Sequence, residues 1–242
     1  EPAAEAAEAL KPLGSAATNL SRSGEAYRPE LLIELYRAIE EQGAAASEAD
    51  ENEMRRVLTA IGSYAKWARE EFHVAHDHFR LLGEDNFRRY LPVAQLRIRV
   101  HAEDSLFDVF CRATAARAAG CRATVSVPPS LEGPAAKAVD LLDQLTASWG
   151  GAIEFVEEED SRIIEAILAG QVERIRYASP ERVPLEIRAA AAEALQYVAD
   201  APVLAHGRVE LLWYLREQSV SHVYHRYGNL GIRAGETRSE PA

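Results

Sequence analysis

The chain contains little cysteine and no long apolar run, and each scarcity excludes a class of protein. Cysteine occurs only at Cys111 and Cys121. Such sparse use is typical of the reducing cytosol, so we expect a cytoplasmic protein in which both residues are buried structural thiols. No apolar run reaches the roughly 20 residues that cross a bilayer, so we expect no membrane span. The N-terminal residues also lack the basic and apolar regions of a secretory signal.

Lysine is scarce as well, and acidic residues outnumber basic ones. The only lysines are Lys11, Lys66 and Lys137, arginine supplies the other positive charges, and the formal net charge is −11. A strongly negative chain repels polyanions, so we expect neither nucleic acid nor an anionic membrane as a partner. Apolar residues make up 48% of the chain and charged residues 27%, which is ordinary for a globular protein. The 242 residues suffice for one large domain, or for one domain with a helical extension.

The first third of the chain predicts a lead-in followed by two helices. Residues 1–28 are rich in Ala, Glu, Ser and Gly with little periodicity, which is typical of a linker. Apolar residues then recur with the helical period, first up to Gly43 and then in a longer stretch ending near Phe72. We therefore predict a helical hairpin within residues 29–80, whose apolar stripe must be buried against another part of the protein.

Beyond Leu91, short apolar strands alternate with amphipathic helices. The pattern predicts strands at residues 96–100, 121–127, 152–156, 172–177, 195–199 and 220–224, with helices between them and a last helix at 208–216. Such βα alternation produces a parallel sheet with helices on both faces. The predicted fold is thus an α/β, Rossmann-like, open and doubly wound sheet with a helical N-terminal lead-in.

The loops of this predicted sheet lack the signatures of a nucleotide site. The first strand-to-helix turn, residues 100–105, contains no glycine and places Glu103 and Asp104 where a pyrophosphate would lie. Gly228 and Gly231 enclose a segment that is too short for the glycine fingerprint. We therefore expect no classical dinucleotide site.

Three histidines near a predicted helix end raise the question of a metal site. His73 and His76 are three residues apart and can share a helix face, and His78 follows closely. A zinc site needs further convergent ligands and supporting hydrogen bonds. We interpret the group as a solvated helix end and expect no metal.

The C-terminal segment is the most distinctive part of the sequence. Aromatic, basic and glycine residues gather there where chain ends are normally polar and frayed: Tyr224, His225, Arg226, Tyr227, Gly228, Asn229, Leu230 and Gly231. One interpretation is a last strand followed by a surface turn. The other is a docking element, because aromatic residues and arginine dominate protein interfaces.

The same segment carries a resemblance to a known family. The sequence of residues 208–231, RVELLWYLREQSVSHVYHRYGNLG, closely resembles the C-terminal motif of long proline utilisation A proteins, as do IRYASPERVP at 175–184 and GEDNFRRYLP at 83–92. These proteins are bifunctional proline dehydrogenase / L-glutamate γ-semialdehyde dehydrogenases that use FAD and NAD. The resemblance covers most of the chain from about Phe79.

This resemblance implies a domain plan and a role. It predicts an aldehyde-dehydrogenase-like α/β domain at residues 81–231 with a docking tail at 219–231, and a disordered end at 232–242. The tail is expected to pack on the catalytic aldehyde dehydrogenase module of the same polypeptide. There it would help cover the cavity that carries the pyrroline-5-carboxylate / glutamate semialdehyde intermediate.

The catalytic positions of the family are altered in this sequence. The asparagine that stabilises the oxyanion falls near Glu103 or Asp104, and a carboxylate would oppose the developing negative charge. The lysine that contacts the cofactor ribose becomes Val127, and the glycine and serine at the cofactor phosphates become Ser179 and Pro180. No segment is similar to the nucleophile loop of the family. We therefore expect no catalysis and no cofactor binding by this chain.

A different class of function remains open from the sequence. The chain could be a free-standing Rossmann-like enzyme, or a binding protein for a small anionic ligand. In that case His225, Arg226 and Tyr227 would form the binding site.

Overall fold

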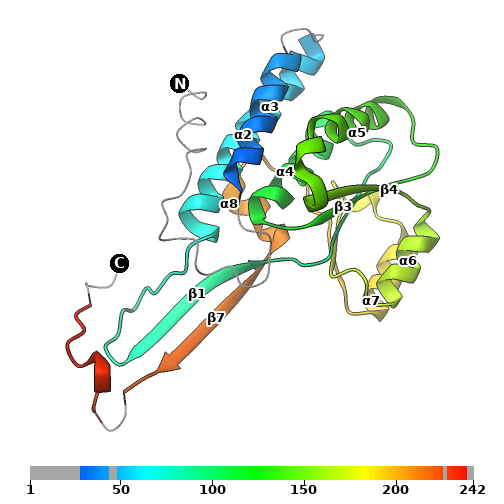
Figure 1. The fold of residues 1–242 in the computed structure, drawn as a ribbon. Coiled ribbons are helices and arrows are strands. Elements are labelled where there is room, and N and C mark those ends of the chain that lie inside the picture. The colour runs from blue at the N-terminus through cyan, green and yellow to red at the C-terminus, as the bar shows by residue number, and fades with distance from the viewer. Residues whose placement is uncertain (1–27, 44–47, 226–227, 239–242) are drawn as a thin grey trace.

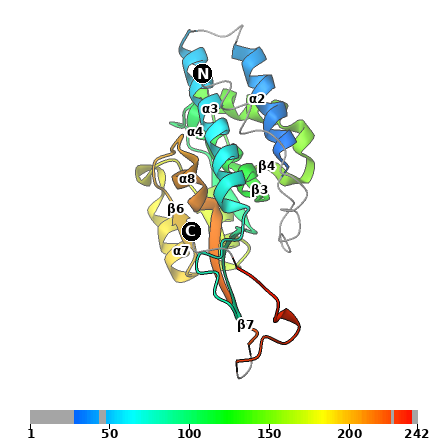
Figure 2. The ribbon, with the colours of Figure 1, turned by 90° about the vertical axis from the view of Figure 1, so that its left-hand side faces the viewer.

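The computed structural model describes residues 28–43, 48–225 and 228–238. These residues form a helical hairpin, an α/β body and a long two-stranded ribbon that projects from the body (Figure 1). Figure 2 shows the ribbon tip below the body, with the residues that follow the ribbon (red) beside it. Among the described residues, no helix has both the length and the apolarity that crossing a membrane requires.

The hairpin consists of α2 (Pro29–Gly43) and α3 (Glu48–Trp67), and α3 continues as one π-helical turn, η2 (Ala68–Phe72). Pro29 is the first helical residue of α2, a position where the missing N–H of proline costs nothing. The apolar stripes of both helices are buried in the same core cluster as residues of the α/β body, such as Leu32 and Ile61 with Phe110. The predicted stripe is therefore buried mainly against α4 (Leu106–Ala119), which packs along α3.

The body contains a parallel sheet of five strands in the order β4-β3-β2-β5-β6, which confirms the predicted fold class. Its strands are β2 (Leu96–Arg99), β3 (Ala123–Val127), β4 (Ile153–Glu157), β5 (Arg174–Arg176) and β6 (Tyr197–Ala199). The other connecting helices are α5 (Gly133–Leu145), α6 (Asp160–Leu168) and α7 (Leu185–Glu193), with 3-10 turns η3 (Ala147–Ala152) and η4 (Pro180–Arg182).

Local sequence signals explain where these elements begin and end. Ser105 and Asp108 form a reciprocal capping box at the start of α4, and Gly120 ends that helix with φ 83°. Helices α4 and α5 share the large core with the hairpin, whereas α6 and α7 enclose a second cluster that includes Ile163 and Ile187. The two clusters place helices on opposite faces of the sheet, as expected for a doubly wound fold.

Two sequence predictions for residues 208–224 are wrong in the region of the ribbon. The predicted helix at 208–216 is a single turn, α8 (Gly207–Glu210), followed by a 3-10 turn, η5 (Leu211–Tyr214). The predicted strand at 220–224 begins earlier, as β7 (Leu215–Val223), and lies outside the parallel sheet. It pairs antiparallel with β1 (Glu84–Pro92), a strand for which the sequence gives no signal. Pairing between segments so far apart overrides the local helical pattern, because local periodicity carries no record of the partner strand.

A close backbone contact fixes the base of the ribbon to the hairpin. The amide of Gly207 donates to Ser63 Oγ at 2.9 Å, and the hydroxyl of Tyr64 donates to the carbonyl of Leu204 at 2.6 Å. A Cβ atom on Gly207 would lie 2.5 Å from the carbonyl oxygen of Ser63, closer than such atoms approach. Only glycine therefore fits where α8 meets α3.

We expect Gly207→Ala to destabilise the protein by about 1–3 kcal/mol, because the added methyl group must displace the backbone of α3. The measurement is the free energy of unfolding in urea. Gly151→Ala is the matched control, since a Cβ atom there meets nothing within 4 Å. Equal losses in the two variants would contradict the close contact at Ser63.

Candidate functional site

The first candidate site, which we call the crevice, is the group of residues at the carboxyl ends of β2 and β5. The chain leaves β2 for β3 and β4 on one side, then returns to form β5 and β6 on the other. Doubly wound sheets bind their ligands outside the carboxyl ends of the strands where the order reverses in this way. The residues at this point therefore decide whether the sheet can hold a ligand.

Arg112 of α4 lies fully buried beneath this crevice. Its Nη1 donates to the carbonyl of Arg99 at 2.7 Å and its Nε donates to the carbonyl of Asp108 at 2.9 Å. Its Nη2 donates to the carboxylate of Asp104. A weaker contact of 3.4 Å reaches the carbonyl of Arg176. One guanidinium thus joins the ends of both strands to the first turn of α4.

Asp104 supplies the negative charge for this arrangement. Its side chain is buried, accepts from the amide of His101 at 2.9 Å, and pairs with both Arg112 and Arg182. The Arg182 Nη1 lies 2.7 Å from Asp104 and 3.0 Å from Asp108. Asp104, one of the two residues near which the resemblance places the oxyanion-stabilising asparagine of the family, is therefore held by two guanidinium groups.

The amino terminus of α4 is also occupied by groups of this chain. Helix termini bind phosphates through their free amides. Here the amide of Phe107 donates to the carboxylate of Glu53 at 3.0 Å, and that of Asp108 donates to Ser105 Oγ at 3.1 Å. The Glu53 carboxylate and the Ser105 hydroxyl thus accept from amides that a bound phosphate would otherwise use.

A second buried network lies beside the crevice. Glu210 is fully buried and accepts from Arg176 Nη2 at 2.8 Å, the hydroxyl of Tyr214 at 2.9 Å and the amide of Leu204 at 2.9 Å. Burial, with the nearby Glu210 charge, raises the pKa of Tyr214 well above its ordinary value, so Tyr214 stays a hydrogen-bond donor. These bonds connect the end of β5 to α8 and to the start of the ribbon.

The other predicted cofactor positions also lie in ordinary structural surroundings. Val127 is the last residue of β3, and Pro180 begins η4. The hydroxyl of Ser179 donates to Glu181 at 2.7 Å.

Both cysteines are free and fully buried, as the sequence predicts for structural thiols. Burial raises the pKa of Cys121 to about 12 and that of Cys111 well above its ordinary value. The Sγ of Cys121 donates to the carbonyl of Tyr214 at 3.1 Å. Each therefore remains a thiol at neutral pH, whereas nucleophilic catalysis requires the thiolate.

The three histidines do not converge. His73 Nε2 bonds the carbonyl of Ala118 at 2.8 Å, and burial lowers the pKa of His73. His76 instead bonds the carbonyl of Glu71 at 2.9 Å and stacks on His78 with ring centroids 5.5 Å apart. Within the described parts of the chain, no group of three or more His, Cys, Asp or Glu residues is arranged to hold a metal.

The second candidate site is the ribbon tip, where Tyr224 meets Gly83. The amide of Tyr224 donates to the carbonyl of Gly83 at 2.9 Å, and its hydroxyl accepts from the Gly83 amide at 3.0 Å. His225 Nδ1 lies 3.1 Å from the same carbonyl. A Cβ atom on Gly83, whose φ is 94°, would lie 2.7 Å from the His225 ring. Glycine therefore lets the end of β7 close against the start of β1.

The structure describes only some of the remaining predicted docking residues. Arg226 and Tyr227 lie outside the described residues. Gly228, Asn229 and Gly231 are exposed and Leu230 is half-buried. The side-chain oxygen of Asn229 accepts from the amide of Gly231 at 2.8 Å, at the start of the 3-10 turn η6 (Gly231–Arg233).

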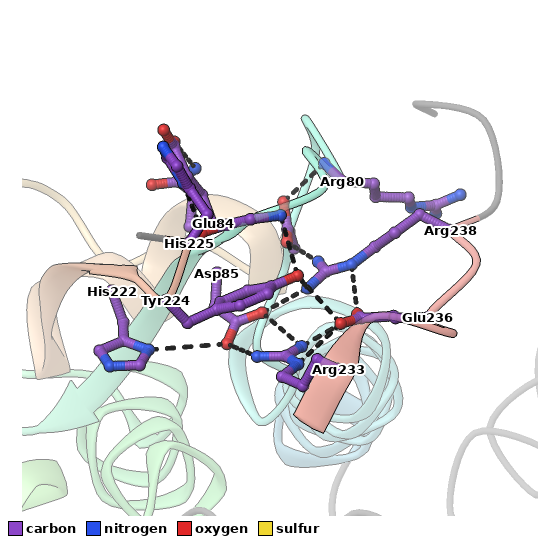
Figure 3. Close-up of polar contacts among 12 residues, drawn as sticks. Arg80, Glu84, Asp85, His222, Tyr224, His225, Arg233, Glu236 and Arg238 are labelled. Atoms are coloured by element: carbon purple, nitrogen blue, oxygen red, sulfur yellow. Dashed lines mark hydrogen bonds and ion pairs between the residues drawn. The ribbon is translucent and has the colours of Figure 1, made fainter. Parts of the chain in front are cut away.

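Four charged residues at the tip were not singled out by the sequence. Arg233 donates to both oxygens of Asp85, at 2.8 and 3.1 Å, and Arg238 donates to Asp85 as well (Figure 3). Glu236 lies between the two arginines and accepts from both. The hydrogen bond from Arg233 is the main cause that lowers the pKa of Asp85 to about 2. Residues 232–238, predicted to be disordered, therefore contain an ion-paired segment, because their arginines meet a carboxylate far away in the sequence.

We expect Asp104→Asn to lower the free energy of unfolding by about 3–5 kcal/mol, because it leaves the buried Arg112 without its counter-charge. Urea denaturation measures the loss. Glu51→Gln is the matched control, since it removes one carboxylate from an exposed pair with Arg55. A loss no larger than in the control would contradict the central position of Asp104.

Known structures share this fold. A variant of proline utilization A from Bradyrhizobium japonicum matches with a TM-score of 0.59 and 16% identity, over 83% of this chain and 21% of that one. A variant of 1-pyrroline-5-carboxylate dehydrogenase from Thermus thermophilus matches with a TM-score of 0.57 and 16% identity, over 82% and 41% of the two chains. An NAD-dependent aldehyde dehydrogenase from Sinorhizobium meliloti matches with 0.60 and 14%, over 81% and 41%.

The comparisons establish fold and relative length. This chain spans about a fifth of the proline utilization A chain that it matches. No protein-family model and no curated protein matches the sequence. At identities of 14–16%, structural likeness shows the fold alone. The chain has the fold shared by aldehyde dehydrogenases and the matching part of proline utilization A, as its sequence resemblance implies.

Proposed function

We propose that this chain is a non-catalytic C-terminal domain of a bifunctional proline dehydrogenase / L-glutamate γ-semialdehyde dehydrogenase. It covers the catalytic dehydrogenase module of the same polypeptide. Its ribbon tip helps to seal the cavity through which the intermediate passes. In this proposal the parent enzyme, and not this chain, binds FAD and NAD.

The crevice carries the non-catalytic part of the proposal. The crevice arginines already have counter-charges within the chain, since Asp104 pairs with Arg112 and Arg182. A dinucleotide would have to displace these bonds and place its phosphates against carboxylates. The buried thiols of Cys111 and Cys121 add support, because neither is available as a thiolate.

The ribbon supports the docking part of the proposal. β1 and β7 pair over nine residues, and the end of β7 lies far from the body (Figure 2). Tyr224 and His225 follow directly after β7. Exposed apolar side chains accompany them near the tip, including Leu82 and Val223. A projection whose end exposes apolar side chains is suited to reach a neighbouring module. The modest share of the proline utilization A chain that this fold covers leaves ample chain for such a module.

We expect the isolated chain to give no saturable heat when titrated with millimolar NAD in a calorimeter. The physical reason is the cost of breaking the Asp104 pairs and burying phosphates beside Glu53 and Asp108. The separately produced dehydrogenase module of the parent serves as the positive control. A dissociation constant below about 100 μM, roughly 5.5 kcal/mol of binding free energy, would refute the non-catalytic assignment.

We expect deletion from His225 onward in the intact parent enzyme to lower dehydrogenase activity and coupled proline-to-glutamate flux, while proline oxidation stays nearly unchanged. The deletion removes the tip residues beyond Tyr224 but leaves the paired strands. Both half-reactions and the lag of the coupled reaction are measured. Deletion from Ser239 onward is the matched control, because it keeps the ion-paired segment. An unchanged lag and dehydrogenase rate in the first deletion would exclude the sealing role.

A further inference from the structure

We propose that residues 231–238 form an electrostatic strap that fixes the ribbon tip, with Asp85 as the carboxylate that holds it. The strap is a conformational device of this chain, and the proposal does not depend on which partner the tip meets. It makes the order of the tip sensitive to ionic strength.

The strap pairs with β1, the strand opposite β7 in the ribbon, and with the loop that precedes β1. Arg233 pairs with Asp85 of β1, and Arg238 pairs with Asp85 and, at 2.9 Å, with Asp77 in the loop before β1. The strap therefore closes a loop with residues about 150 positions earlier. Figure 3 shows both arginines converging on Asp85 with Glu236 between them.

Charge, and not apolar burial, holds the strap in place. Its one large apolar side chain, Ile232, is fully exposed, and Ala234 and Gly235 are exposed as well. The Arg233, Glu236 and Arg238 side chains are 34%, 22% and 15% exposed, within reach of solvent and dissolved ions. Single pairs of this kind contribute little, so the strap depends on several of them acting as a network.

The strap and the tip are linked through Tyr224. The guanidinium of Arg233 lies 3.7 Å from the centre of the Tyr224 ring, and the tyrosine hydroxyl donates to Glu236 at 2.9 Å. The same hydroxyl accepts from the Gly83 amide, which belongs to the turn before β1. Arg238 Nη2 also donates to this hydroxyl, at 3.3 Å. Loss of the strap would therefore remove the guanidinium that lies over the Tyr224 ring and two hydrogen bonds of its hydroxyl.

The charge state of Asp85 is constant over the physiological range. Its pKa is lowered from 3.8 to about 2, so its pairing stabilises the strap above pH 4 and is lost as pH falls toward 2. His222, whose Nδ1 lies 4.0 Å from Asp85, adds positive charge on the same side when it is protonated. We therefore expect the strap to respond to ionic strength. The distance over which salt screens charges falls from about 10 Å at about 0.1 M salt to about 3 Å at about 1 M salt.

The test is hydrogen–deuterium exchange of the full 242-residue chain, followed by mass spectrometry of peptides that cover residues 228–238. The amides of Ala234 and Glu236 donate to carbonyls of the strap, and the amide of Arg233 donates to the carbonyl of Leu230 just before it. We therefore expect these amides to exchange slowly in about 20 mM salt. We expect about 1 M sodium chloride to raise their exchange rate about fivefold or more, while peptides from the core of α4 change little.

Asp85→Asn should raise strap exchange by a similar factor already at low salt, and further salt should then add little. Glu51→Gln, which removes an exposed carboxylate that pairs with Arg55 on α3, is the matched control and should leave strap exchange unchanged. The salt comparison on the unaltered chain keeps the test valid if Asp85→Asn folds poorly. Strap exchange that is equal at both salt concentrations, or equal in Asp85→Asn and the unaltered chain, overturns the proposal.

Discussion

The guanidinium of Arg112 is the group around which the α/β body is organised. It lies without solvent contact beneath the carboxyl ends of β2 and β5, and it bonds the backbone of both strands and the Asp104 carboxylate. A buried ion pair contributes little net stability compared with apolar packing. Removing only one of its two charges is strongly destabilising, because the other charge is then buried without a partner. The two charges therefore require each other, and together they fix the first turn of α4 to the centre of the sheet.

This internal pairing explains how a fold that commonly binds nucleotides can serve a structural role. The carboxylates of Asp104, Glu53 and Asp108 lie around the first turn of α4, the part of a doubly wound fold that commonly binds a phosphate. In our account the polar groups of the crevice pair with one another, and the ribbon is the part of the chain that contacts the partner module. There a second set of ion pairs, centred on Asp85, joins residues 231–238 to β1. The two sites differ in exposure, so the crevice resists solvent ions while the tip responds to them.

The sequence predicts the body of this fold well, because its signals there are local. The Ser105 capping box, Gly120 and the apolar periods identify the strands and helices of the sheet within a few residues. The ribbon could not be predicted in this way, since β1 mixes charged and apolar residues on both of its faces and its partner strand lies about 130 residues away. For the crevice, the sequence indicated that Asp104 would repel a cofactor, but not that Arg112 and Arg182 neutralise it. The partners of Asp85 are likewise defined only by the fold.

The most direct test of the central claim is a high-resolution crystal structure of this chain grown with millimolar NAD. Our account predicts continuous density for Arg112 between the ends of β2 and β5, with Asp104 in contact with Arg112 and Arg182 and no nucleotide in the crevice. Nucleotide density at the amino terminus of α4, with Asp104 turned away from Arg112, would contradict it.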